Sequence, residues 1–149
     1  MANQLVLGTT VAPLEEALLA GDIEKSSGGP VLLIVDGDRL AADTWSAIFR
    51  LHGYRVMTAY DGETGFSMAQ TMSPDLLLTG VTIEGINGVD LALLVRSTIP
   101  GCKVLLFAGQ SPQEMLAAAG ASEYGFQTVV RPVHPTQMLR RAAAWLEAA

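Results

Sequence analysis

From residue 31 onward, the sequence alternates between short apolar runs and longer segments with helical periodicity. Short apolar runs are typical of buried strands, and apolar residues every three to four positions are typical of amphipathic helices. Because a helix-length segment follows each strand, the strands should pair in parallel through right-handed crossovers. The predicted strands are Val31–Val35, Tyr54–Ala59, Leu76–Thr79, Lys103–Ala108 and Thr128–Val130, and the predicted helices are Arg39–His52, Glu63–Met72, Val89–Thr98, Pro112–Ala119 and Thr136–Glu147.

This pattern predicts an α/β fold, a doubly wound five-stranded parallel sheet of (βα)5 type. The first, third and fourth strands are almost continuously apolar, as expected when helices cover both faces of a sheet. Gly53 should end the first helix as a C-cap glycine would, and Ser73-Pro74 should end the second. The run "ING" resembles a hairpin turn, but the helical period after it favours a loop that enters a helix at Gly88.

The first thirty residues differ from the rest in charge. They hold four acidic residues against one lysine, a balance of −3 within the net charge of −6. Residues 11–25 have the pattern of a short amphipathic helix, with Leu14, Ala17 and Leu18 on one face. The Ser/Gly-rich stretch after it resembles a linker. We predict an N-terminal extension over residues 1–30 and one domain over residues 31–149.

The composition argues against several classes of function. Half of the residues are hydrophobic and 16% are charged, as in globular proteins. No apolar run approaches the roughly 18 residues of a membrane span. The acidic balance and the lack of a basic stripe argue against nucleic-acid and membrane partners. One cysteine, Cys102, and an N-terminus without a basic residue before its hydrophobic stretch favour a cytoplasmic protein without a secretory signal.

Two strand ends carry charged residues. "VLLIVDGD" places Asp36 and Asp38 after the first strand, where acids can hold Mg²⁺ or handle phosphate. The alternative, that they cap the following helix, is favoured for so short a motif. "VVRPVHP" places Arg131 after the last strand, where it can neutralise an acid at the same sheet edge. The other strand ends offer Gly80 and Ala108, and no catalytic triad, zinc spacing or phosphate-binding loop accompanies them.

Several motifs in order resemble the receiver domains of two-component response regulators. They are "VLLIVD", "LHGYRVMTAYDGETG", "SPDLLLTGVTIEGINGVDLALLVR", "PGCKVLLFAGQ" and "VVRPVHPTQML". The resemblance implies the flavodoxin-like, CheY-like fold. Members of that family take a phosphoryl group from a histidine kinase onto an aspartate, with Mg²⁺ bound alongside.

Carried over position by position, the resemblance implies a loss. The phosphoacceptor aspartate falls on Gly80, and the switch hydroxyl falls on Ala108. Of the acidic pair, one member falls on Asp36 and the metal-binding one on Gly37. The lysine falls on Arg131. The switch aromatic falls on or near Thr128.

These positions predict a degenerate receiver, or pseudo-receiver, that is neither an enzyme nor phosphorylated. An acyl phosphate needs a carboxylate, and Mg²⁺ would normally need two protein carboxylates here. We expect no metal, no cofactor and a vestigial pocket in which Arg131 pairs with Asp36, with Asp38 as a second acid within reach. With no output domain evident, the chain should act as a stand-alone adaptor or a competitor for a partner.

The partner surface is expected on the first helix. Leu40, Thr44, Ala47, Ile48 and Leu51 fit a core stripe, and Trp45 and Phe49 form a second stripe turned away from it. The resemblance implies a histidine kinase, a phosphotransfer protein or another regulator as the partner. The alternative is that both aromatic residues lie at the margin of the core or under the N-terminal helix.

Two other functions remain open at this point. A haloacid-dehalogenase-like phosphate hydrolase would use Asp36 and Asp38, although the later strand ends lack its acidic pair. A small-ligand sensor is the second, since missing side chains at the sheet mouth can leave a pocket.

Overall fold

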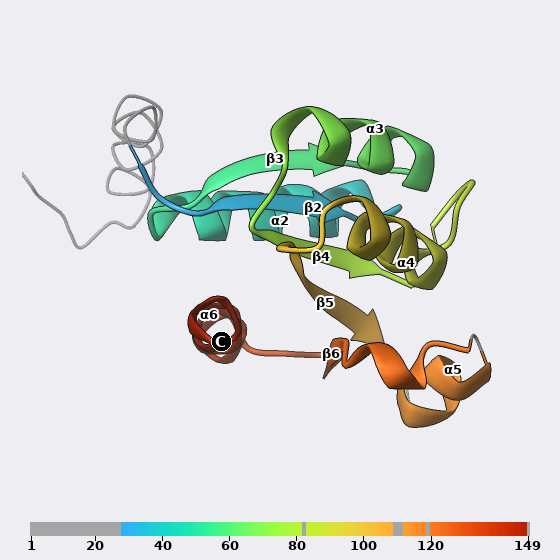
Figure 1. The fold of residues 1–149 in the computed structure, drawn as a ribbon. Coiled ribbons are helices and arrows are strands. Elements are labelled where there is room, and N and C mark those ends of the chain that lie inside the picture. The colour runs from blue at the N-terminus through green and yellow to red at the C-terminus, as the bar shows by residue number, and fades with distance from the viewer. Residues whose placement is uncertain (1–27, 82, 109–111, 119, 149) are drawn as a thin grey trace, which may run out of the picture.

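A computed structural model describes residues 28–81, 83–108, 112–118 and 120–148. Its sheet is parallel throughout, with the strand order β3-β2-β4-β5-β6. The α/β prediction is confirmed, and the predicted amphipathic segment 11–25 lies outside the described residues. The strands are β2 Val31–Val35, β3 Arg55–Ala59, β4 Leu76–Gly80, β5 Lys103–Ala108 and β6 Gln127–Val130; the helices are α2 Arg39–Leu51, α3 Gly62–Met72, α4 Gly88–Thr98, α5 Pro112–Ala118 and α6 Pro135–Glu147, with a 3-10 turn η2 at Ser122–Tyr124 (Figure 1).

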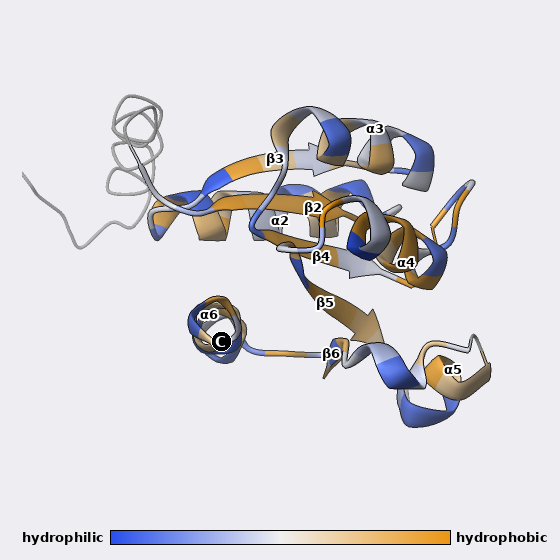
Figure 2. Ribbon diagram, in the orientation of Figure 1, coloured by the Kyte–Doolittle hydropathy of each residue, from blue (hydrophilic) through white to orange (hydrophobic). Residues whose placement is uncertain are grey.

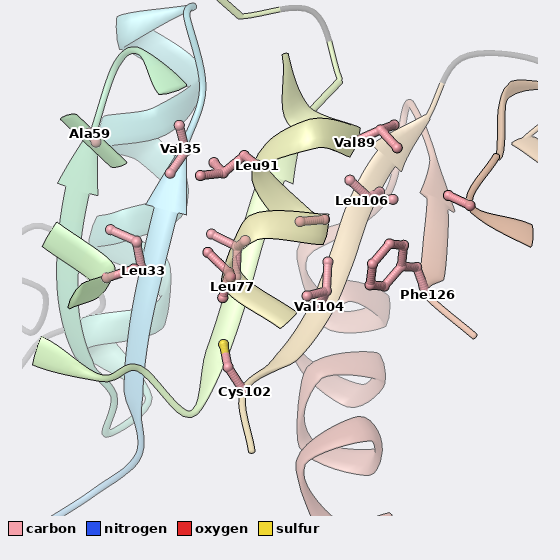
Figure 3. Close-up of a cluster of buried hydrophobic side chains, with 14 residues drawn as sticks. Leu33, Val35, Ala59, Leu77, Val89, Leu91, Cys102, Val104, Leu106 and Phe126 are labelled. Atoms are coloured by element: carbon pink, nitrogen blue, oxygen red, sulfur yellow. The ribbon is translucent and has the colours of Figure 1, made fainter. Parts of the chain in front are cut away.

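Two helical layers cover the sheet. Side chains of α3, α4 and α5 pack on one face, and those of α2 and α6 pack on the other. Figure 1 shows α3 and α4 on the opposite side of the sheet from α6. Hydrophobic residues run along β2 in Figure 2, while the helices carry both kinds of residue. Figure 3 shows the first cluster, in which Leu77 and Val104 lie beside α4 with Cys102 at one end.

Side-chain caps fix the helix ends close to the predicted positions. Asp38, Asp61 and Asn87 cap α2, α3 and α4 by accepting hydrogen bonds from backbone N–H groups in the first turn. Gly53 follows His52, the C-cap of α2, with φ +96°, a left-handed backbone that favours glycine. Ser73 ends α3, as predicted from Ser73-Pro74.

The face that α2 turns to the sheet was predicted wrongly. Phe49 is fully buried and Trp45 is partly buried against the same cluster, whereas Leu40 is 77% exposed and Leu51 38%. The helix has two apolar stripes, and the stripe with the aromatic residues is the one that faces the sheet. Aromatic side chains remove the most apolar area from water, which explains why this stripe is buried. Ser46 is buried on this stripe. Its hydroxyl donates to Ala42 O at 2.8 Å and shares a hydrogen bond with Thr58 Oγ1 at 2.6 Å, so the polar group has partners.

Candidate functional site

The carboxyl ends of four strands meet at one edge of the sheet, which we call the mouth. In the register, Val35 pairs with Thr79, Gly80 with Phe107, and Ala108 with Val130. Asp36 and Arg131 directly follow β2 and β6. The parallel sheet therefore brings together the predicted pocket residues, which lie far apart in the sequence. They are Asp36, Gly37, Asp38, Gly80, Ala108 and Arg131.

An ion pair joins the first and last of these residues. Arg131 Nη2 donates to Asp36 Oδ2 at 2.7 Å. The Asp36 side chain is 7% exposed, and the Arg131 side chain is 45% exposed. The other carboxylate oxygen, Oδ1, accepts from the backbone N–H of Asp38 at 3.0 Å. Both oxygens of this nearly buried carboxylate therefore have a donor, as a buried charge requires. The predicted Asp36–Arg131 pair is present.

Phe107 forms the second contact of the Arg131 guanidinium. The Arg131 Cζ atom lies over the Phe107 ring, 4.1 Å from its centroid, a cation–π arrangement. The Trp45 ring lies 5.9 Å from the Phe107 ring. The sequence analysis did not single out Phe107, although an aromatic residue next to the β5 strand end, level with Gly80, was a usable signal.

Asp38 has a different role from Asp36. Its Oδ1 accepts from the Ala41 N–H at 3.2 Å and caps α2, so the capping interpretation is right for Asp38 and wrong for Asp36. The structure shows no ion pair between Asp38 and Arg131, although the sequence predicted Asp38 as a second acid within reach of Arg131. One carboxylate is bonded to a helix N-terminus and the other to a guanidinium. Gly37 between them adds only backbone.

Gly80 leaves room for a side chain. A Cβ built there would lie 3.5 Å from Arg131 Nη2 and 3.6 Å from Asp36 Oδ2, which are ordinary contacts. Gly88 differs, because a Cβ on it would lie 1.8 Å from Gly80 O. The chain therefore needs a glycine at 88 for the close approach of two backbones. At position 80 neither crowding nor a left-handed backbone requires one.

The residues at the mouth do not fit Mg²⁺, the metal that the family resemblance implies. Mg²⁺ prefers carboxylate oxygens together with phosphate and water. Asp36 Oδ2 is bonded to a cation, and Gly37 and Gly80 have no side chains. Across the described residues, no three His, Cys, Asp or Glu side chains are grouped so that they could hold a metal ion.

The remaining polar groups at the mouth make local bonds. The Thr79 hydroxyl is buried and donates to Gly80 O at 2.9 Å. Ala108, where a switch hydroxyl was expected from the resemblance, is buried and has no polar side-chain atom. His52 and His134 cap helix ends. None of these side chains is arranged as an activated nucleophile.

Tyr60, Asp43 and Arg39 form a cluster beside the mouth that was not predicted from the sequence. Tyr60, just after β3, donates to Asp43 Oδ1 at 2.5 Å, and Arg39 Cζ lies 4.0 Å from its ring centroid. The hydrogen bond with Asp43 is the main reason that the pKa of Tyr60 is raised. This cluster ties the first turns of α2 to the end of β3.

A groove of about 510 Å³ runs along β6 and α6. Asp36, Gly80 and Ala108 do not line it. Its lining residues are Thr128, Val129, Val130, Pro132, Val133, Gln137, Arg140 and Arg141.

Residues 32–143 match the family model described as the response regulator receiver domain. The chain belongs to this family. As a receiver domain, it has a role in two-component signalling, and such domains are generally non-enzymatic modules. The family match covers the sheet and the mouth described above.

Named relatives support the assignment. The chain is 29% identical over 125 residues to the probable transcriptional regulatory protein TcrX of Mycobacterium tuberculosis, covering 83% of this chain and 53% of TcrX. It is 26% identical to the DNA-binding response regulator MtrA of Mycolicibacterium smegmatis, covering 77% of this chain and 50% of MtrA. The receiver chain therefore spans about half the length of these curated relatives.

Solved structures agree with the fold. A putative response regulator from Chloroflexus aurantiacus superimposes with a TM-score of 0.71 at 27% identity, over 81% of this chain and all of that one. The signal receiver domain of an HD-domain-containing protein from Pseudomonas fluorescens gives a TM-score of 0.73 at 17% identity, over 80% and 96%. In the part of the receiver chain that the structure describes, no helix is long and apolar enough to cross a membrane.

Proposed function

We propose that this receiver is a pseudo-receiver, a phosphorylation-independent protein-interaction module in two-component-type signal transduction. The observation that carries the proposal is the 2.7 Å contact between Arg131 Nη2 and Asp36 Oδ2. It lies beside a strand end, Gly80, that offers no carboxylate. The resemblance implies a phosphoacceptor at that position, so the acceptor is absent and a fixed ion pair stands next to its place.

The charges of the mouth support this proposal. An acyl phosphate forms only on a carboxylate, and Asp38 is bonded to the N-terminus of α2. Asp36 is nearly buried and bonded to a guanidinium, which is planar and permanently charged. The pair is neutral as a whole and needs neither a phosphoryl group nor a metal to balance it. The mouth therefore has one stable arrangement, and the domain would bind its partners without a phosphorylation switch.

The hydrolase alternative is not favoured. Asp36 and Asp38, the acids it would use, are held by Arg131 and by the first turn of α2. Among the described residues, the positions that end β4 and β5 and follow β6 are Gly80, Ala108 and Arg131, and none of them is an acid. A metal-assisted phosphate hydrolase needs those groups to hold its ion.

The proposed partner is a protein, namely a histidine kinase, a phosphotransfer protein or another regulator. TcrX and MtrA are named as transcriptional or DNA-binding regulators, but this chain spans about half of each. Its net charge of −6 disfavours direct binding to nucleic acid. We place the protein in the cytoplasm, with residues 1–30 as an extension in front of a receiver domain over 31–149.

A binding experiment tests this function. The full chain is used to capture partners from the host lysate, and the affinity of the purified partner is then measured by calorimetry. Acetyl phosphate with Mg²⁺ should leave Kd unchanged within about twofold, because no group in the mouth accepts phosphoryl. A tenfold or larger change in Kd that depends on acetyl phosphate and is lost in Asp36→Asn would overturn the proposal.

A further inference from the structure

The outward side of α2 carries an apolar stripe. We call Leu40, Thr44, Ala47, Ile48 and Leu51 the outer stripe. These residues recur at helical spacing and share one side of the helix. Leu40 is 77% exposed and Leu51 is 38% exposed, while Ala47 and Ile48 are partly exposed. The solvent side of a helix in a globular domain is normally polar, so an apolar stripe there indicates a contact surface.

The chain enters the domain at the end of α2 that carries Leu51. Arg55 Nε donates to Gly29 O at 3.1 Å, and Arg55 N donates to Pro30 O at 2.9 Å. Gly29 also lies against the turn that ends α2, since a Cβ on it would be 2.5 Å from Gly53 O. The first described residues therefore lie beside the end of the outer stripe that carries Leu51.

The length of the preceding segment matches that of α2. The thirteen residues of α2 span about 20 Å at the rise of an α-helix. Residues 11–25 would span about 22 Å in the same conformation. Only the stretch 26–29, Ser-Ser-Gly-Gly, separates them from the entry point. With residue 25 near Leu51, residue 11 would reach the Leu40 end of the stripe, so the segment has the length to run along α2 in the same direction.

Charge and hydropathy of the two surfaces are complementary. Residues 1–30 have a balance of −3, from four acids and one lysine. Residues 39–55 hold three arginines against Asp43, a balance of +2. The amphipathic pattern of 11–25 also gives one apolar face, with Leu14, Ala17 and Leu18, to meet the outer stripe.

We propose that residues 11–25 form a helix that docks on the outer stripe and runs parallel to α2. The negative balance of this segment complements the positive balance of residues 39–55. A protein partner that binds this side of α2 has to displace the N-terminal helix first. The extension is thus a built-in competitor for one surface of the receiver, and this inference stands independently of the chemistry at the mouth.

Amide hydrogen exchange of the full chain, read by mass spectrometry, tests the docking. Residues 11–25 should be protected in the wild-type protein. In Leu40→Glu and in Leu51→Glu, the exchange rate of this segment should rise at least tenfold, because a carboxylate would be placed in the apolar contact. Leu40 is 77% exposed, so its replacement leaves the core of the domain in place.

Leu94→Glu is the matched control. Leu94 is also 38% exposed but lies on α4, on the other face of the sheet. It should leave the exchange of residues 11–25 unchanged within twofold. Unprotected amides at 11–25 in the wild-type chain would overturn the proposal, as would equal deprotection by Leu94→Glu. Protection that disappears on hundredfold dilution would overturn it in favour of a second copy as the occupant.

Discussion

At the scale of single residues, the Asp36–Arg131 pair balances a charge that would otherwise be buried alone. We expect Arg131→Met to lower the free energy of unfolding by about 1–3 kcal/mol, the cost of leaving a buried acceptor without its donor. Half-exposure of Arg131 places the value toward the lower end, because solvent screens the pair. Urea unfolding at pH 7 measures it.

A double-mutant cycle separates the pair from its surroundings. Asp36→Asn combined with Arg131→Met should recover part of the loss, because the neutral amide no longer needs the cation. Arg140→Met, at an exposed arginine on α6, controls for the loss of one positive charge. Simple additivity of the two single changes would mean that Asp36 and Arg131 do not interact energetically.

Cys102 provides a second prediction at this scale. Burial is the main reason that the pKa of its thiol is raised from 9.0 to about 12. Thiol reagents attack the thiolate, so the native chain should react very slowly at pH 8 and react fully in denaturant. Fast stoichiometric labelling of the native protein would show that this part of the core opens.

The same thiol gives a pH dependence whose sign is fixed. A raised pKa in the folded state means that the native protein holds the proton more tightly than the unfolded chain does. The contribution is fully present below pH 9 and is lost as the pH rises toward about 12. The stability of Cys102→Ala should decline less over that interval.

The contacts of a single residue could be predicted where the sequence around it carried the signal. The strand-end positions of Asp36 and Arg131 predicted their pairing, because the carboxyl ends of parallel strands meet at one edge. Phe107 escaped notice because its contact with Arg131 depends on where the chain goes after β6. Asp38 was resolved only by the hydrogen bond from Ala41 N–H.

At the scale of secondary structure, α2 shows what periodicity can and cannot decide. Its start and end carried local signals, since Asp38 caps its N-terminus and Gly53 follows its C-cap with a left-handed backbone, as the sequence predicted. Its rotation about its axis had no such signal, because two apolar stripes compete for the sheet. The contacts of Phe49 with the buried cluster decide which stripe faces the sheet, and these contacts are made with residues distant in the sequence.

The corrected rotation of α2 makes a sharp stability prediction. Phe49→Ala should cost about 3–5 kcal/mol in the free energy of unfolding, as expected for removing a fully buried aromatic side chain. Leu40→Ala, on the outer stripe of the same helix, should change it by no more than about 0.5 kcal/mol. Chemical denaturation of both variants gives the comparison. Equal losses in the free energy of unfolding for Phe49→Ala and Leu40→Ala would contradict the rotation of α2 described here.

At the scale of the whole molecule, the alternation of periods predicted the five-stranded parallel sheet because each βα unit carries its own signal. The strand order places β2 next to β4, so that Asp36 and Gly80 lie at the ends of neighbouring strands at one edge. The sequence also predicted the ion pair at that edge, although Arg131 lies 95 positions from Asp36, because both residues follow strands that end there. The family fold is thus retained around a mouth whose chemistry we propose has changed.

The most direct test of that proposal is the intact mass of the full chain after incubation with acetyl phosphate and Mg²⁺. A phosphorylatable receiver domain in the same reaction shows that the donor is active. We predict that the control gains the mass of one phosphoryl group while this chain gains none, because Gly80 offers no acceptor and Arg131 holds Asp36. A phosphoryl adduct on this chain that maps to Asp36 or Asp38, and disappears when that residue is changed to Asn, would contradict the account.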